Sequence, residues 1–257
     1  METISSVQNP KIKRLIALQQ KSSLRRESGL FVVEGARELE HCLEAGFEVD
    51  TVFRCPRIAG PIPEGLKVVD VSTQVYSKIA YREGTEGIIA EVRSRERRLD
   101  DLKLSDNPLI VVLESVEKPG NLGAVLRSSD AAGADAVIIC DPLTDIYNPN
   151  LIRSSIGAVF TVPVIACTSE EAIGFFKGRG IQILTAQLQD SSLYYDRVMT
   201  NGTAIVMGTE STGLTDIWRE AADAHIRIPM LGRLDSLNVS VSAAILLFEA
   251  VRQRSNA

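Results

Sequence analysis

Three short segments of this chain combine glycine with small polar side chains, and each lies where an apolar run meets a helix or loop. They are residues 119–128 (PGNLGAVLRS), 208–214 (GTESTGL) and 236–242 (SLNVSVS). Glycine lets a backbone approach a ligand closely, and the N–H groups at the start of a helix bind polar or anionic groups. These residue types therefore indicate ligand binding.

The third segment leads into a helix predicted over residues 238–254, with Asn238 as a suitable N-cap. Apolar side chains occupy every face of this helix, which is typical of a buried helix because surface helices are amphipathic. A buried helix with a donor-rich N-terminus is suited to face a ligand. The same pattern is expected of a capped core helix or a dimer-interface helix, and periodicity alone does not separate these interpretations.

Other site chemistries fit the three segments less well. Gly120 and Gly123 follow an apolar run as in a dinucleotide-binding turn, but the third glycine and the ribose-binding acid are missing. The sequence has no phosphate-binding loop with its lysine. The two histidines, His41 and His225, lie outside the segments, so a Ser–His–Asp arrangement is not expected.

Composition limits the class of protein. The chain has 257 residues and a formal net charge of −5, which suits two modest globular domains. It has no apolar run of about eighteen residues and no apolar signal core, so we expect neither a membrane span nor a cleaved leader. The cysteines are scattered along the chain, which argues against a zinc site or a disulfide framework: Cys42, Cys55, Cys140 and Cys167. We therefore expect a cytoplasmic protein without a metal.

The charge is unevenly distributed, which matters because proteins that bind phosphates usually carry a basic region. Residues 105–257 carry most of the negative excess, whereas residues 1–40 lean positive and residues 93–98 (RSRERR) form a second basic cluster. Solvated helix faces and a linker are the commoner explanation of any single charge run. The basic side chains considered as RNA contacts are Lys11, Lys13, Arg14, Arg25 and Arg26.

Strands and helices are predicted to alternate along the whole chain. Before a charged linker at residues 93–107, the predicted strands are 30–34, 49–53, 66–70 and 87–92, and the helices are 9–20, 35–46 and 71–80. After the linker, the predicted strands are 109–114, 136–140, 162–165, 181–185 and 203–208, and the helices are 121–132, 149–157, 168–178, 215–222 and 238–254. This alternation predicts an α/β fold with a parallel sheet covered on both faces. Ligands of such sheets bind beyond the carboxyl ends of the strands, where the three segments fall.

In this order and spacing, the three segments resemble the motifs of the SpoU (TrmH-like) RNA ribose 2′-O-methyltransferases of the SPOUT superfamily. The resemblance covers residues 106–254 closely and implies a methyltransferase domain over residues 106–257, with a deep trefoil knot. Residues 1–95 resemble, more loosely, the small ribosomal-protein-like α/β domain that binds the RNA substrate in many family members. That match depends mainly on FVVEGARELEHCLEAG.

The resemblance implies S-adenosylmethionine as the cofactor and assigns roles to particular residues. The implied cofactor-binding residues are Gly208, Ile228 and Leu237, with Thr185, Ala186, Met230 and Ser236 as further candidates. Methyl transfer requires alignment of the reacting groups and removal of a ribose hydroxyl proton. The implied catalytic residues are Arg127, which activates the hydroxyl, Glu210, which positions Arg127, and Asn121, Asn238 and Ser240, which hydrogen-bond near the reacting groups.

The motif wording and the two-domain layout resemble ribosomal RNA enzymes most, so ribosomal RNA is the expected substrate and transfer RNA the alternative. A rival from another class is a non-catalytic RNA-binding or assembly factor that kept the fold. The intact Asn121, Arg127, Glu210 and Asn238 argue against that rival. We also expect a homodimer, because the last helix is too apolar for an exposed surface and family members pair through this region.

Overall fold

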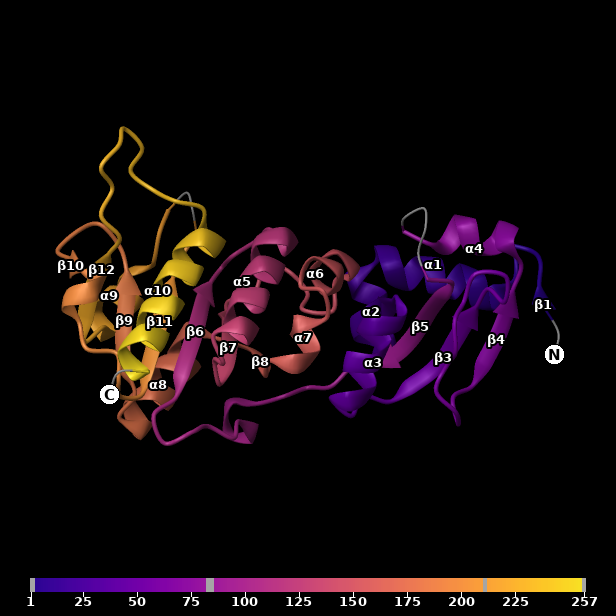
Figure 1. The fold of residues 1–257 in the computed structure, drawn as a ribbon, viewed down its shortest axis with the longest axis horizontal. Helices are drawn as coiled ribbons and strands as arrows, with labels where there is room; N and C mark the ends of the chain where they lie inside the picture. Colours follow the sequence, from indigo (N-terminus) through magenta and orange to yellow (C-terminus); the bar gives the residue numbers. More distant parts are fainter. Residues whose placement is uncertain (1–2, 82–85, 210–211, 256–257) are drawn as a thin grey trace. The chain divides into compact units, whose positions relative to one another are not determined.

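The computed structural model describes residues 3–81, 86–209 and 212–255. The chain forms two compact units (Figure 1). The first unit consists of Met1–Glu96 and Asp145–Thr161, and the second consists of Arg97–Thr144 and Val162–Ala257. Residues 145–161 were predicted to belong to the methyltransferase domain, whereas in the structure they group with the first unit. No helix in the described part of the chain is both long and apolar enough to cross a membrane.

A mixed five-stranded sheet forms the centre of the first unit, with the order β1-β4-β3-β5-β2. Its strands are β1 (Thr3–Ile4), β2 (Leu30–Glu34), β3 (Val49–Arg54), β4 (Val68–Val71) and β5 (Ile88–Arg93). Strand β5 runs antiparallel to β2 and β3, and β4 runs parallel to β1 and β3. The helices of this unit are α1 (Pro10–Gln20), α2 (Ser22–Ser28), α3 (Ala36–Glu44), α4 (Thr73–Ile79), α6 (Pro149–Ser154) and α7 (Ala158–Thr161).

The two faces of this sheet bury different sets of helices, because successive residues of a strand point to opposite sides. Leu30 and Val32 of β2 share one apolar core with buried residues of α1 and α4. Phe31, between them, stacks on Tyr147 with ring centroids 4.3 Å apart and lies 6.1 Å from the ring of Phe160. Residues 145–161 therefore complete the core of the first unit on its second face.

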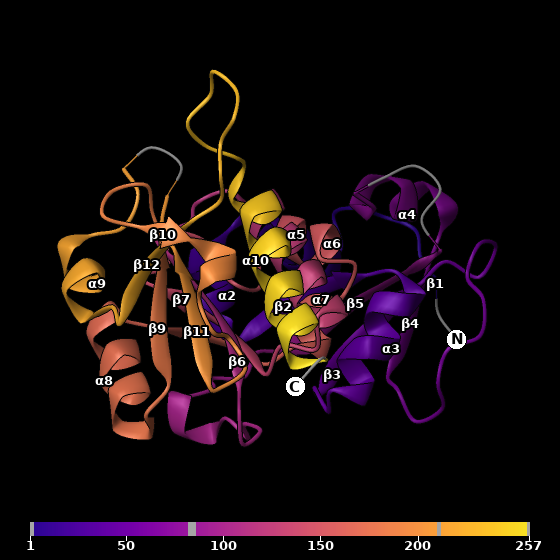
Figure 2. The same cartoon turned by 60° about the vertical axis from the view of Figure 1, so that its left-hand side comes forward.

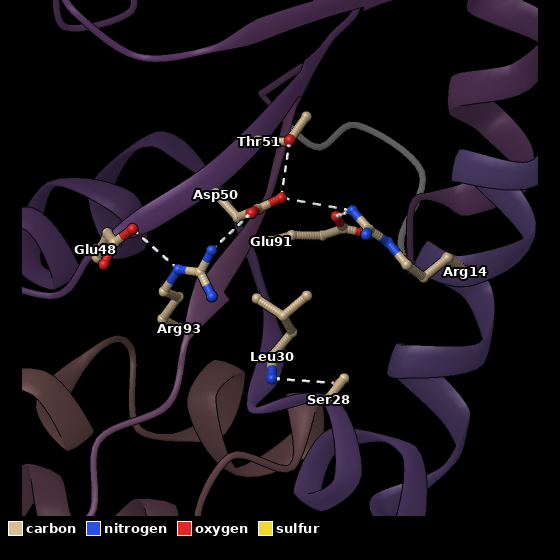
Figure 3. A network of polar contacts seen from close by, with 8 residues as sticks. All are labelled: Arg14, Ser28, Leu30, Glu48, Asp50, Thr51, Glu91 and Arg93. Atoms are coloured by element: carbon tan, nitrogen blue, oxygen red, sulfur yellow. Dashed lines mark hydrogen bonds and ion pairs between the residues drawn. The ribbon is translucent and has the colours of Figure 1, made fainter.

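Two basic side chains of the first unit are paired with carboxylates inside it. The Arg14 guanidinium donates hydrogen bonds to the buried Glu91 carboxylate and lies 3.5 Å from Asp50 (Figure 3). Burial raises the pKa of Glu91, and the hydrogen bonds from Arg14 oppose that shift. Arg25 is buried, and its Nε donates to Asp145 at 2.6 Å.

The pairing buries Arg25, whereas 44% of the Arg14 side chain stays exposed, so the role of these residues as RNA contacts stays a prediction. Removing one partner from a buried ion pair is costly, so the Arg25 guanidinium is not available to a phosphate without loss of packing. The predicted basic residues that are exposed are Lys11, Lys13, Arg14 and Arg26.

The second unit contains a seven-stranded sheet with the order β10-β12-β9-β11-β6-β7-β8. Every neighbouring pair is parallel, which confirms the predicted parallel α/β fold. The strands are β6 (Leu109–Glu114), β7 (Ala136–Cys140), β8 (Val164–Cys167), β9 (Gln182–Ala186), β10 (Ser192–Leu193), β11 (Thr203–Met207) and β12 (Ala224–Arg227). The helices are α5 (Pro119–Ala131), α8 (Ser169–Arg179), α9 (Asp216–Ala221) and α10 (Val239–Arg254), with 3₁₀ turns at Leu99–Asp101 and Tyr194–Asp196.

Helices cover both faces of the parallel sheet. Strand residues such as Ile138 and Val206 pack with Phe176 of α8 and Trp218 of α9 in one apolar core. The strand residues that alternate with them point to the opposite face, where α5 and α10 lie side by side (Figures 1 and 2). Because β12 lies next to β9 whereas α10 packs on α5 and β11, the segment between β12 and α10 crosses the carboxyl ends of the strands. The trefoil knot itself stays a prediction.

Most predicted elements are found close to their predicted bounds, and the differences have local causes. Asn9 caps α1 as predicted, since its side chain accepts a hydrogen bond from the Lys11 N–H at 2.9 Å. The helix predicted over residues 149–157 is divided, because Ile156 and Gly157 both have positive φ, 55° and 82°, and end the helical path. The short elements β1, α2, β10 and β12 were not predicted, because none has a sustained apolar period.

One pair of cysteines is close in space although distant in sequence. Cys140 and Cys167 are register partners at the ends of β7 and β8. The Cys167 thiol and burial both raise the pKa of Cys140. All four cysteines are free thiols. Among the described residues, no group of three or more His, Cys, Asp or Glu side chains is placed to hold a metal ion.

Candidate active site

A cavity of about 340 Å³ lies in the second unit, at the carboxyl ends of β9, β11 and β12. This is the edge at which parallel α/β sheets bind ligands, and the volume falls in the range of about 300–1,000 Å³ typical of small-molecule sites. Segments that follow these strands form its walls, and the first turns of α10 close it. The lining includes residues 186–189, 207–209, 212–214, 226–228 and 235–237, with Arg219, Met230, Val239, Ser242 and Leu246.

The predicted cofactor residues fall largely together around this cavity. Those that line it are Ala186, Gly208, Ile228, Met230, Ser236 and Leu237. Thr185 is not among the described lining residues. It is fully buried one position earlier in β9, and its hydroxyl lies 2.6 Å from Nδ1 of His225 on β12. Thr185 therefore ties two strands together beneath the cavity, and its expected contact with the cofactor stays a prediction.

Gly208 has a structural role that the sequence alone did not indicate. A Cβ atom at this position would lie 2.3 Å from both the carbonyl carbon and the oxygen of Gly213, and 2.6 Å from the Leu214 nitrogen. The loop after β11 therefore returns against its own first residue, and an isolated bridge joins Thr209 to Gly213. The glycine was predicted to make room for a ligand. In the structure, the space beside Gly208 is taken by the backbone of Gly213 and Leu214.

The N-termini of α5 and α10 are joined by the predicted asparagines. Asn238 caps α10: its Oδ1 accepts hydrogen bonds from the Ser240 backbone N–H at 3.0 Å and from the Ser240 hydroxyl at 2.6 Å. Its Nδ2 donates to Oδ1 of Asn121, in the first turn of α5, at 3.1 Å. Two helix N-termini placed together create a region of positive potential that favours anionic or electron-rich groups.

Arg127 and Glu210 stand apart from this arrangement. Arg127 is exposed on α5, six positions after Asn121, and it is not among the described residues that line the cavity. Glu210 lies outside the described residues. Within one chain, the structure therefore brings Asn121, Asn238 and Ser240 together, but it does not bring Arg127 to the cavity.

Glu114 is a buried acid that the sequence analysis did not single out. It ends β6, and its two carboxylate oxygens accept hydrogen bonds from the backbone N–H and the hydroxyl of Thr215, the N–H at 2.9 Å. This contact anchors the end of the loop 208–214 to β6. A carboxylate at the end of the apolar run LIVVLE was the available signal, but its partner lies 101 residues away in sequence.

The cavity also contains polar atoms that lack a partner within the chain. Oε1 of Gln187 and Nε of Arg219 are buried, and neither has a hydrogen-bond partner among the described residues. Buried polar atoms are normally paired, so an unpaired acceptor and an unpaired donor in one cavity indicate a ligand that supplies both partners. Apolar walls from Met207, Leu214 and Ile226 suit a flat ring or an aliphatic chain.

A parallel sheet with a half-polar cavity at its carboxyl edge defines an α/β domain that binds a small ligand. Comparison with known families gives the particular class. Residues 108–248 match the sequence model of the SpoU rRNA Methylase family, and residues 9–90 match that of the MRM3-like substrate binding domain. The chain belongs to the SpoU rRNA methylase family.

Individual relatives agree with this assignment. The 23S rRNA (guanosine-2′-O-)-methyltransferase RlmB of Escherichia coli (strain K12) is 42% identical over 177 residues, which cover 66% of this chain and 72% of the relative. A solved RNA 2′-O ribose methyltransferase is 40% identical, with a TM-score of 0.86 over 99% of this chain and 100% of that one. An AdoMet-bound rRNA methyltransferase from Sinorhizobium meliloti is 30% identical, with a TM-score of 0.89 over 98% of this chain and 97% of that one.

Proposed function

We propose that this protein transfers the methyl group of S-adenosylmethionine to a ribose 2′-hydroxyl of 23S ribosomal RNA. The observation that carries the proposal is the cavity at the carboxyl edge of the parallel sheet, beside the Asn121–Asn238 hydrogen bond that joins two helix N-termini. The names of the Escherichia coli relative and of the structures similar over the whole chain support the reaction and the class of RNA.

The residues of the cavity fit S-adenosylmethionine. Its adenine and its aliphatic chain suit the apolar walls, and its amino and carboxylate groups suit the unpaired Gln187 Oε1 and Arg219 Nε. When bound, the cofactor supplies an electrophilic methyl group, so the protein needs only to align the reacting atoms and deal with one proton. Gly208, Ile228 and Leu237 would hold the cofactor through the loops on which they lie.

Reaction at the ribose needs a group that lowers the pKa of the hydroxyl or accepts its proton. We assign this role to Arg127, with Glu210 positioning it and with Asn121, Asn238 and Ser240 fixing the polar groups nearby. A guanidinium is a poor base, so it would act by stabilising the developing alkoxide or through an adjacent phosphate. Because Arg127 does not line the described cavity of its own chain, we propose that a partner subunit supplies it in a homodimer.

The first part of the chain would bind the RNA substrate. The match of residues 9–90 to a substrate binding domain supports this role for residues 1–95, and residues 106–257 would carry the reaction. A cytoplasmic location is part of the proposal, because the ribosomal RNA methyltransferases that the chain resembles are bacterial proteins. In this proposal the chain binds no metal.

The test is methyl transfer from labelled S-adenosylmethionine to an unmodified 23S rRNA transcript, followed by mapping of the product nucleotide. We expect one alkali-resistant phosphodiester, the mark of a 2′-O-methylated ribose, and no labelling of unmodified transfer RNA. Methylation of a base, or of transfer RNA alone, would contradict the proposal. Calorimetry with S-adenosylmethionine separates the non-catalytic rival, because an assembly factor without the reaction needs no cofactor.

A further inference from the structure

A second, larger cavity of about 610 Å³ lies entirely within the first unit, away from the candidate active site in the second. Its walls come from the turn between β2 and α3, from the end of α4 and the residues after it, and from the start of α6. The side chains that define its polar character are Glu34, Arg37, Glu38, Lys78, Tyr81, Glu86 and Arg153.

The acidic residues of this cavity are occupied by groups of the chain itself. Both carboxylate oxygens of Glu34 accept hydrogen bonds from the Tyr81 backbone N–H, at 3.0 and 3.1 Å. The Glu86 carboxylate accepts one from the Ala36 N–H at the start of α3. Glu38 is paired with Arg37 at 3.0 Å. The backbone hydrogen bonds fix the positions of Glu34 and Glu86, and Arg37 offsets the charge of Glu38.

Two cations of the cavity wall have no such pairing. In residues 3–81, 86–209 and 212–255, no carboxylate forms an ion pair with Lys78 or Arg153. Lys78 is exposed at the end of α4, whereas Arg153 is half-buried on α6. A phosphate that contacted the cavity wall would therefore meet the positive charges of Lys78 and Arg153.

An aromatic ring lies at the edge of the same cavity. The Tyr81 side chain is exposed over 55% of its surface, although it is large and largely apolar. The guanidinium of Arg153 lies over its ring, 3.7 Å from the centroid. The two planar groups thus form a preformed stack. Aromatic rings and guanidinium planes are the groups on which unstacked RNA bases bind.

We propose that this cavity holds one unstacked nucleotide of the RNA substrate. The base stacks against the Tyr81–Arg153 pair, and the adjoining phosphates contact Lys78 and Arg153. The inference rests on the proposed function, in that the substrate is RNA. The inference also extends the proposed function. Because Asn148, Asn150 and Arg153 line the cavity, residues 145–161 belong to the RNA-binding surface together with the N-terminal residues.

Binding of an unmodified 23S rRNA transcript, measured by filter binding over a series of salt concentrations, tests the site. Tyr81→Ala should weaken binding roughly five- to a hundredfold, the range for loss of one stacked base, without changing the salt dependence. Tyr81→Phe keeps the ring and should bind as the wild type does. Lys78→Ala should lower the slope of log affinity against log salt by about one.

The Arg153 guanidinium supplies both a positive charge and a planar group for stacking. Two substitutions separate these two contributions to RNA binding. Arg153→Lys keeps the charge, so the salt slope should persist while affinity falls, whereas Arg153→Ala should lose both. Arg57→Ala is the matched control, since Arg57 is exposed in the same unit and does not line the cavity. Thermal melting of each variant shows whether it is folded. If Arg153→Ala does not fold, the comparison of Tyr81→Ala with Tyr81→Phe still tests the site.

Equal affinity of Tyr81→Ala and the wild type overturns the site, as does a loss in Arg57→Ala as large as that in the cavity variants. Either result leaves the proposed function intact, provided that the wild type methylates the transcript. Failure of the wild type to methylate RNA at all is the separate outcome that removes the proposed function.

Discussion

Gly208 shows how one absent side chain shapes the candidate active site. We predict that Gly208→Ala weakens S-adenosylmethionine binding at least tenfold, because its Cβ would lie 2.3 Å from Gly213 and force the loop away from the cavity. Calorimetry measures the affinity. Gly232→Ala is the matched control, since a Cβ at Gly232, on the loop that follows Ile228, meets no atom within 4 Å. Unchanged affinity in a folded Gly208→Ala protein would contradict the close return of the loop.

The Arg54–Asp70 pair gives a pH-dependent prediction. Arg54 donates to both carboxylate oxygens of Asp70, at 2.8 and 3.1 Å, and lowers the pKa of that carboxyl. A carboxyl with a lowered pKa stabilises the folded state above its unfolded-state pKa, about 3.9, and loses this effect as pH falls through its folded-state pKa. Asp70→Asn should therefore lower the free energy of unfolding at pH 7, and the difference from wild type should shrink toward pH 3.

Urea unfolding at pH 7, 5 and 3 measures this difference. Glu64→Gln is the control, because Glu64 is exposed and forms no ion pair in the part of the chain that the structure describes. A deficit in Asp70→Asn that is as large at pH 3 as at pH 7 would show that packing, and not the charge of Asp70, carries the effect.

Single residues of the site were predictable where a local pattern identified them. Asn238 stands immediately before an apolar helix, and Gly208 follows an apolar strand, so both could be found from neighbours in sequence. Glu114 and Tyr81 could not, because their partners are Thr215 and Arg153, which lie far away along the chain. Long-range contacts of this kind leave no local periodicity, and sequence patterns report only local periodicity.

At the level of secondary-structure elements, the order of the sequence does not show that helices α6 and α7 belong to the first unit. They fall between two strands of the parallel sheet, yet their apolar side chains pack on β2 in the first unit. Strands of five or six residues were predicted within one or two positions, because burial on both faces favours a continuous apolar run. The pattern of α6 and α7 shows only that these helices bury a face, and not which sheet covers it.

Phe31 tests this packing. Phe31→Ala should lower the free energy of unfolding by about 3–5 kcal/mol, the usual cost of removing a buried phenyl ring, because it leaves Tyr147 and Phe160 without their central contact. Urea unfolding provides the measurement. Leu231→Ala, at a side chain that is 97% exposed, should change stability by less than about 0.5 kcal/mol. If Phe31→Ala and Leu231→Ala lowered the free energy of unfolding by similar amounts, the contact of Phe31 with residues 145–161 would not stabilise the fold.

The same packing decides how the RNA-binding role of the first unit can be tested. Deletion of residues 1–95 would uncover the apolar side chains of α6 and α7, such as Ile152 and Phe160, and the remaining fragment would be expected to aggregate. Loss of RNA binding in such a fragment would report misfolding as readily as a missing RNA contact. Point substitutions at exposed side chains of the first unit are therefore the informative experiment.

At the scale of the whole molecule, the net charge of −5 is reconciled with RNA binding by the placement of charges and not by their sum. Two of the predicted basic contacts, Arg14 and Arg25, neutralise carboxylates of the first unit. The cations that face open space, such as Lys78, act on a phosphate locally, because salt screens charges more than about 8–10 Å away. An acidic protein can thus bind RNA through a small set of unpaired cations.

The surface of α10 supports the proposed homodimer. Val241 and Phe248 are 47% and 48% exposed, and they lie seven residues apart, two helical turns, on one face of α10. Exposed apolar side chains on a helix of this kind indicate a covered surface in solution. A closed dimer built on such a surface is isologous, so each subunit would offer Arg127 to the other.

Subunit mixing tests this composite site. Arg127→Ala should keep the fold, the dimer and the affinity for S-adenosylmethionine, but lose at least about a hundredfold in methyl transfer, and Arg127→Lys should not restore it. Asn238→Ala should be inactive for a different reason, because it removes the hydrogen bond to Asn121 beside the cavity.

If Arg127 acts across the interface, a heterodimer of the two variants has one site with both residues intact. Equal mixing makes about half of the dimers heterodimers, each with one active site of two, so activity should return to about a quarter of wild type. Differently tagged subunits and native mass spectrometry count the heterodimers. Heterodimers that form but stay inactive would contradict the shared site, and full activity of the Arg127→Ala homodimer would remove Arg127 from the reaction.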